Sequence, residues 1–172
     1  AVMTATIAIV DYCKGNLASV QRGLADAGFD ARITDVPADI LAADGVVLPG
    51  VGAFTDAMTT MEETGQADAL RTAVADGVPF LGICLGLQAA VCEFARDVAG
   101  MPKASSAEFD AELEYPVIDL MPDQADIDAK GGTQRLGSYP CKIEPDTLAH
   151  RVYGEDLISE RHRHRYEVNN AF

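Results

Sequence analysis

The residues best suited to chemistry surround Cys84, in the segment Gly82–Gln88 that reads GICLGLQ. An apolar strand is expected before the cysteine, over 79–83, and a helix from Leu85 onward. A nucleophile at a strand-to-helix turn needs small neighbours, which the glycines two residues before and after it provide. The helix N-terminus would favour the thiolate, and the amide of Leu85 could stabilise an oxyanion. The segment predicts a cysteine nucleophile; a buried packing cysteine between two glycines is the alternative.

A cysteine hydrolase also needs a base that takes the thiol proton and later protonates the leaving group. The histidines are His150, His162 and His164, and the chain contains no His-x-Glu sequence. If 158–168 forms one strand, its alternation places Arg161, Arg163 and Arg165 on one face and two of the histidines on the other. We therefore expect none of the three to serve Cys84, and we expect His150 to be solvated.

The elements that must position Cys84 alternate along the first half of the chain. Apolar runs predict strands at 6–10, 31–34, 45–48 and 79–83, and helical spacing predicts helices at 16–27, 53–61, 67–75 and after 84. This order predicts an α/β fold with an open, mostly parallel sheet and helices on both faces. Ligands bind beyond the carboxyl ends of such strands, where Pro49–Gly52 and Cys84 lie.

The second half has a different character. Strands are expected at 116–120, 133–143 and 158–168, with a short helix over 147–153, and the 172 residues together are expected to form a single domain.

The formal net charge of −14 argues against nucleic acid and anionic membranes as partners, and favours a solvated acidic surface. A salt-rich cytoplasm would also favour it. No run of eighteen apolar residues occurs, so a cytoplasmic protein is expected. Because no cysteine pair has C-x-x-C spacing, we expect no disulfide, metal or cofactor, and we expect buried packing roles for Cys13, Cys92 and Cys141.

The motif G-I-C-L-G-x-Q resembles the nucleophile elbow of the class I, or triad, glutamine amidotransferases. Residues 5–88, through segments 11–12, 15–20 and 48–54, are similar to the glutaminase subunit of imidazole glycerol phosphate synthase. The resemblance implies a flavodoxin-like fold and a second oxyanion donor at Gly50 and Val51, beside Leu85. It also implies that Gly52 and Gln88 contact the substrate.

Residues 89–170 are instead similar to the glutaminase domain of CTP synthase. The similarity lies in segments 93–96, 106–109, 116–122, 131–137 and 160–170, with Gln134 where that family usually has Met. It implies glutamine contacts at Gln88, Glu108 and Arg165. A carboxylate suits the α-ammonium of an amino acid and a guanidinium suits its α-carboxylate. The chain thus reads as two family halves joined near 84–89.

The resemblance implies that Cys84 attacks the side-chain amide of L-glutamine and that ammonia passes to a synthase partner. The cyclase barrel of histidine biosynthesis is favoured, and CTP synthase is next. In both families the His-x-Glu that activates the cysteine lies in a segment that would follow residue 172, so the domain is expected to be truncated at its C-terminus and to self-associate through an open sheet edge. One alternative is a glutamine-binding module without turnover. Another is a different cysteine hydrolase on a similar elbow.

Overall fold

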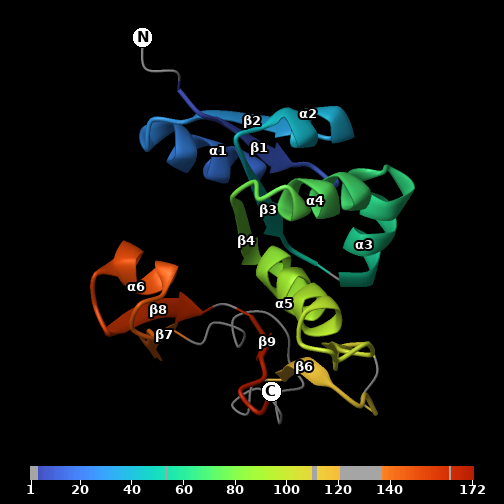
Figure 1. Ribbon diagram of the computed structural model, residues 1–172, viewed down its shortest axis with the longest axis vertical. Helices are drawn as coiled ribbons and strands as arrows, with labels where there is room; N and C mark the ends of the chain where they lie inside the picture. Colours follow the sequence, from blue (N-terminus) through green and yellow to red (C-terminus); the bar gives the residue numbers. More distant parts are fainter. Residues whose placement is uncertain (1–3, 53, 110–111, 121–136, 163) are drawn as a thin grey trace. The chain divides into compact units, whose positions relative to one another are not determined.

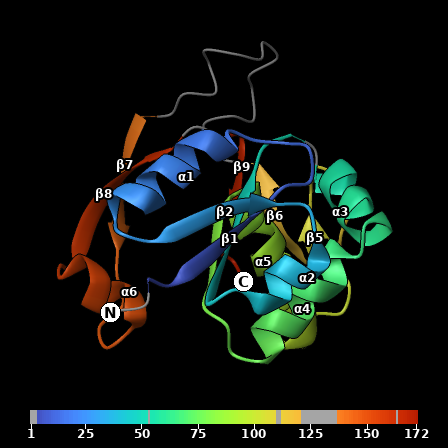
Figure 2. The ribbon, with the colours of Figure 1, turned by 90° about the horizontal axis from the view of Figure 1, so that it is seen from above.

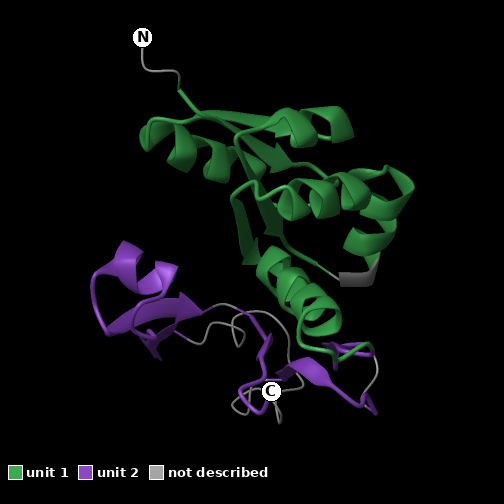
Figure 3. Cartoon of the chain, in the orientation of Figure 1, with its two compact units in different colours: residues 1–102 green, residues 103–172 purple. Residues whose placement is uncertain are grey.

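The computed structural model describes residues 4–52, 54–109, 112–120, 137–162 and 164–172. They form two compact units, residues 1–102 and residues 103–172 (Figure 3). This boundary lies after the point near 84–89 where the two family resemblances meet. The expectation of one domain over 1–172 stays a prediction.

Unit 1 is built on a four-stranded sheet in the order β2-β1-β3-β4, with every neighbouring pair parallel. The strands are β1 (Thr6–Val10), β2 (Asp30–Thr34), β3 (Gly45–Gly50) and β4 (Phe80–Cys84). β3 is buried along its whole length, as its continuous apolar run predicts for a parallel strand covered on both faces. The predicted α/β class and the parallel sheet are confirmed.

Four helices connect these strands: α1 (Leu17–Asp26), α2 (Pro37–Ala42), α3 (Phe54–Glu63) and α4 (Gln66–Ala75). A fifth, α5 (Leu85–Asp97), follows β4. Figure 2 shows α1 on one side of β1 and β2 and α2 and α4 on the other, so helices cover both faces of the sheet. The side chain of Asn16 caps α1 by accepting a hydrogen bond from the amide of Ser19 at 3.3 Å. α2 starts at Pro37 and was absent from the prediction, because six residues carry too little periodicity.

The core of unit 1 lies between this sheet and its helices. It contains apolar residues of the strands and helices, among them Val10, Ile40, Val46, Leu48 and Leu70. Gln66 is buried among them, and its Nε2 donates to the carbonyl oxygens of residues 11 and 35 at 2.8 and 3.0 Å. These two bonds fix the segments that follow β1 and β2, so they hold the carboxyl end of the sheet in place.

Unit 2 contains two small sheets. One is ordered β5-β6-β9, from β5 (Ser105–Ser106), β6 (Pro116–Leu120) and β9 (Tyr166–Val168); the other pairs β7 (Gly137–Lys142) with β8 (Leu157–His162). The helix α6 (Leu148–Tyr153) joins β7 to β8 (Figure 1). The expected strand at 116–120 and the expected helix at 147–153 are confirmed. Residues 133–136 of the expected strand 133–143 lie outside the described residues.

The expectation of one strand over 158–168 is wrong. β8 ends at His162, which is the last residue in register with β7, opposite Gly137. The chain then changes sheets, and β9 pairs antiparallel with β6 through Tyr166 opposite Leu120. Arg165 lies in the bend between the strands, so the strict alternation of faces ends before it.

Candidate active site

Cys84 occupies the turn that the sequence predicted, as the last residue of β4 and the residue that caps the N-terminus of α5. Its backbone has φ 56° and ψ −115°, a region that residues with a Cβ rarely adopt. Such a conformation costs on the order of 1–3 kcal/mol, and it clusters at functional sites. The side chain is exposed. The elbow therefore presents an accessible thiol at the start of a helix, where the backbone N–H groups are free of intrahelical partners.

The two glycines near Cys84, Gly82 and Gly86, are required because backbone atoms of other residues lie too close to leave room for a Cβ. A Cβ built on Gly82 would lie 2.7 Å from the carbonyl oxygen of Gly86. A Cβ on Gly86 would overlap the carbonyl oxygen of Leu48 and lie 2.9 Å from its carbonyl carbon. α5 thus begins in direct contact with the backbone of β3 and with the strand that precedes the elbow. The G-x-C-x-G spacing is a packing requirement of the elbow itself.

The backbone of residues 49–51 lies next to the elbow. Gly50 pairs in register with Cys84 in the parallel ladder. A Cβ on Gly50 would lie 2.5 Å from the Cβ of Leu85 and 2.9 Å from the amide nitrogen of Gly86. Val51 and Gly52 follow in exposed positions, and Gly52 has φ 95°. The structure therefore brings together the three residues expected as oxyanion donors, Gly50, Val51 and Leu85, around Cys84; their role remains a prediction.

Tyr12 lies beside the elbow; the sequence analysis placed it in the resemblance segment 11–12 but gave it no role at the site. Its side chain is 2% exposed, and its hydroxyl donates to the carbonyl oxygen of Pro49 at 2.9 Å. Burial raises the pKa of the Tyr12 phenol, the backbone of Val51 lowers it by hydrogen bonding, and the charge of Cys84 raises it again. Tyr12 thus fixes the carboxyl end of β3, from which the loop at Val51 begins. The sequence signal that could have identified Tyr12 is its position just after β1, because ligands bind beyond the carboxyl ends of strands in such a sheet.

The remaining predicted substrate contacts divide between the units. Gln88 lies in the first turn of α5 and is half-buried. Glu108 follows β5 and is exposed, and Arg165 precedes β9 and is half-buried. Because β5 is parallel and β9 antiparallel to β6, these two residues emerge at the same end of β6, beyond Leu120. Unit 2 therefore places a carboxylate, Glu108, and a guanidinium, Arg165, at the same end of its sheet.

The histidines are paired with carboxylates. His162 Nδ1 lies 2.9 Å from Glu167 Oε2, and His150 Nε2 lies 2.8 Å from Asp156 Oδ1. His164 Nε2 lies 3.8 Å from the same Glu167 oxygen, and burial lowers the pKa of His164. An imidazole oriented by a carboxylate is the form that a general base takes. The expectation that His162 and His164 share the face of one strand is wrong, because β8 ends at His162.

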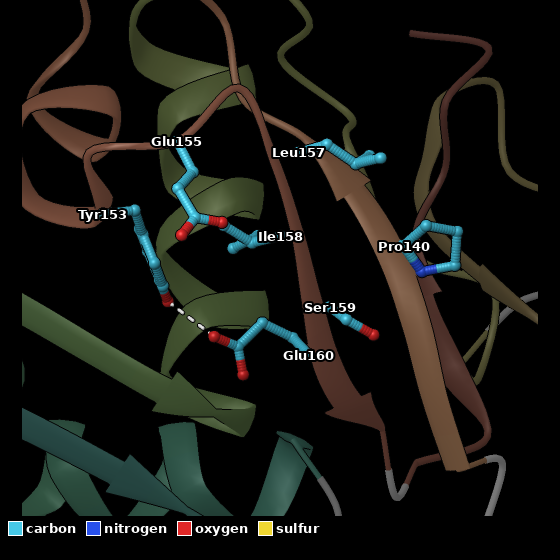
Figure 4. Close-up of a pocket in the computed structure, with 7 residues that line it drawn as sticks. All are labelled: Pro140, Tyr153, Glu155, Leu157, Ile158, Ser159 and Glu160. Carbon is cyan, nitrogen blue, oxygen red and sulfur yellow. Dashed lines mark hydrogen bonds between the residues drawn. The ribbon is translucent and has the colours of Figure 1, made fainter.

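Two hollows lie apart from the elbow residues. One, of about 470 Å³, lies on the β7–β8 hairpin and α6 in unit 2 (Figure 4). In it the Tyr153 hydroxyl points toward Glu160 and donates to Oε1 at 3.0 Å. The other, of about 600 Å³, lies in unit 1 between α3, α4 and α5 and has an apolar lining. Cys84 lines neither of them, and neither contains another predicted site residue.

The other cysteines correct one expectation. Cys92 is buried, and burial raises the pKa of its thiol to about 11. Cys13 and Cys141 are exposed, so the buried role expected of them is wrong. Cys13 follows β1 with φ 65°, and Cys141 lies in β7, where every residue except Tyr139 is exposed. Within the described residues, no helix has the length and apolar character that crossing a membrane requires.

A parallel sheet with a cysteine at a strained strand-to-helix turn defines a nucleophile elbow on an open α/β sheet. Residues 8–172 match the model of the family described as glutamine amidotransferase class-I. The chain therefore belongs to the class I glutamine amidotransferase family.

Within this family, the similar proteins reported below are CTP synthases. The chain is 60% identical over 108 residues to the CTP synthase of Rubrobacter xylanophilus, covering 63% of this chain and 19% of that protein. It is 52% identical over 130 residues to the CTP synthase of Pelotomaculum thermopropionicum, covering 76% and 23%. The glutaminase domain of Trypanosoma brucei CTPS with bound acivicin superposes with a TM-score of 0.72 at 26% identity, covering 98% of this chain and 69% of that one. The chain thus spans about a fifth to a quarter of these curated CTP synthases.

Proposed function

We propose that this chain is a glutaminase domain that hydrolyses L-glutamine to glutamate and ammonia through a thioester at Cys84. The observation that carries the proposal is the elbow: a strained, exposed cysteine in register with Gly50 and followed directly by the N-terminus of α5. The family match over residues 8–172 supports the same chemistry.

In this mechanism the Cys84 thiolate attacks the side-chain amide carbon of glutamine. The carbonyl oxygen becomes an oxyanion that backbone amides at Gly50, Val51 and Leu85 stabilise by hydrogen bonding, and Gly52 contacts the substrate. The carbon–nitrogen bond then breaks, the nitrogen takes a proton and leaves as ammonia, and water hydrolyses the γ-glutamyl thioester. Gln88 contacts the substrate beside the nucleophile.

Glu108 and Arg165 are proposed to bind the backbone groups of glutamine. The Glu108 carboxylate complements the α-ammonium, and the Arg165 guanidinium complements the α-carboxylate as a two-pronged donor. Their emergence at one end of β6 supports a shared ligand, because the two groups of an amino acid are only one carbon apart.

The ammonia acceptor is proposed to be a CTP synthase-type domain. Relatives that are 52–60% identical over more than 100 residues are CTP synthases. The cyclase barrel favoured by the resemblance of residues 5–88 has no such support. The proposed place of the chain is therefore in pyrimidine nucleotide synthesis.

A second candidate is a glutamine-binding module that forms the thioester, or holds glutamine, without turnover. It is favoured by one observation: the 172 residues contain no His-x-Glu sequence.

A single experiment separates the candidates. The 172-residue chain is incubated with a glutamine-mimicking diazo-ketone, or with acivicin, the adduct is located by mass spectrometry, and ammonia release from glutamine is measured separately. Labelling at Cys84 with ammonia release supports the glutaminase. Labelling without release supports the binding module, and no labelling overturns both.

The controls use the other cysteines. Cys84→Ser should abolish labelling, whereas Cys141→Ser, which removes another exposed thiol, should leave it unchanged. Arg165→Lys should slow labelling while keeping the charge, because lysine lacks the planar two-pronged donor.

A further inference from the structure

Three side chains of unit 2 converge where the chain leaves β8 and enters β9. His162 is the last residue of β8, Glu167 lies in β9, and His164 lies between the strands. One ligand atom from each lies within 4.8 Å of the other two. The rings of His162 and His164 have their centroids 5.0 Å apart. The side chains are 22%, 26% and 31% exposed, so the cluster is partly enclosed and still accessible to a solute.

The ligand atoms in this cluster lie within about 1.5 Å of the separations that a small cation requires. Zn²⁺ binds imidazole nitrogen and carboxylate oxygen at about 2.0–2.2 Å in a tetrahedron, which places two ligand atoms about 3.4 Å apart. The Glu167 oxygen lies 2.9 Å from His162 Nδ1 and 3.8 Å from His164 Nε2, on either side of that value. Small side-chain rotations would therefore bring all three atoms into one coordination sphere.

The chemistry of the cluster supports the same ligand. Two imidazoles and one carboxylate are the three protein ligands of open zinc sites, which keep a fourth position for water. The His164 nitrogen that faces the Glu167 carboxylate is Nε2, so His164 would bind the cation through this atom.

We propose that His162, His164 and Glu167 form a binding site for a borderline divalent cation of the Zn²⁺ class, with its fourth position open to water. The cation takes the place of the hydrogen bond between His162 Nδ1 and the Glu167 carboxylate, and the ring proton is then carried by Nε2. It also links the β7–β8 hairpin to the β5-β6-β9 sheet at their junction. The cysteine spacing had suggested that no metal binds, but these ligands come together only because the strand breaks after His162.

The test titrates the 172-residue chain with Co²⁺, whose visible absorption reports tetrahedral nitrogen and oxygen ligands, and then with Zn²⁺ in competition. Thiols are alkylated beforehand, so that exposed cysteines cannot bind the metal. We expect one Co²⁺ per chain, displaced by Zn²⁺. Glu167→Gln and His164→Gln should each weaken binding by at least about tenfold, a loss that even outer-shell changes typically produce.

The matched control is His150→Gln, which removes a histidine paired with a carboxylate outside the cluster and should leave the affinity unchanged. A measurement on the unaltered chain guards against misfolded variants: Co²⁺ should shift or broaden the ring NMR signals of His162 and His164 and spare those of His150. Absence of saturable binding overturns the proposal. The proposal is also overturned if Co²⁺ affinity is unchanged in Glu167→Gln and His164→Gln, or if binding is lost in His150→Gln.

Discussion

The hydroxyl of Tyr12 offers a sharp test of how the elbow is held. Its hydrogen bond to the Pro49 carbonyl, at 2.9 Å, is buried, and Pro49 lies in the fully buried β3. Tyr12→Phe removes the donor and leaves that carbonyl without its partner. A buried acceptor left unsatisfied costs about 1–3 kcal/mol. In a unit of about 100 residues, each kcal/mol lowers the Tm by about 4–8 °C.

The substitution should also act on chemistry. A Cβ on Gly50 would lie 2.9 Å from the Tyr12 hydroxyl, so this oxygen is part of the wall that shapes the loop after β3. Without it, the backbone of residues 49–51 can shift away from the elbow. We expect slower labelling of Cys84 by the diazo-ketone even at saturating probe, because the change affects positioning of the oxyanion donors and leaves the glutamine contacts intact.

The assay combines thermal unfolding by circular dichroism, native-state hydrogen exchange of the β1 and β3 amides, and the labelling rate of Cys84. The matched control is Tyr153→Phe, which removes a hydroxyl bonded to Glu160 at an exposed position and should change stability by less than about 0.5 kcal/mol. If Tyr12→Phe behaves like Tyr153→Phe in all three measurements, the role assigned to Tyr12 is refuted.

Four other predictions follow from burial, close approach and charge. At pH 8 iodoacetamide should modify Cys84 and spare Cys92 in the folded chain, because a thiol pKa of about 11 leaves about one thiolate in a thousand; equal rates by mass spectrometry would contradict this. Gly86→Ala should lower the free energy of unfolding in urea by about 3 kcal/mol or more, because the added Cβ overlaps the backbone of β3. Gly23→Ala, in open space on α1, should instead raise it by about 0.5–1 kcal/mol. Gln66→Met should cost about 2 kcal/mol or more by the same assay, since two backbone carbonyls lose their donor. The net charge of −14 predicts loss of helical circular dichroism in low salt; an unchanged spectrum from low to high salt would contradict it.

The parallel half of the fold was predictable because its strands are buried on both faces. Such strands read as short apolar runs, and the helices between them are long enough to show a period. β3 and β4 differ from their predicted bounds by at most two residues. The elbow was predictable for a related reason. Its glycines, the cysteine and the first turn of α5 are neighbours along the chain, so a local sequence pattern is enough to specify it.

Unit 2 could not be predicted to the same degree, because two of its strands, β5 and β9, have only two and three residues. β5 has two residues and pairs with β6 across an irregular register, which leaves no periodic signal. The alternating Arg and His residues around 161–165 suggested one continuous strand. Instead, Tyr166 pairs with Leu120 of β6, a partner 46 residues earlier in the chain, and this is non-local information. Tyr12 was missed because an aromatic residue after a buried strand fits the core equally well.

The geometry of the elbow does not depend on catalytic competence. The strained backbone of Cys84 is maintained by contacts wholly within unit 1: the ladder to Gly50, the close approach of Gly86 to Leu48, and the buried Tyr12 hydroxyl. Each contact forms when the sheet and α5 pack, and none requires bound glutamine or a general base. The nucleophile can therefore be presented, and can react with an activated glutamine analogue, in a chain that turns over slowly or not at all. Labelling of Cys84 thus tests the elbow, and ammonia release tests the base, so the two measurements are independent.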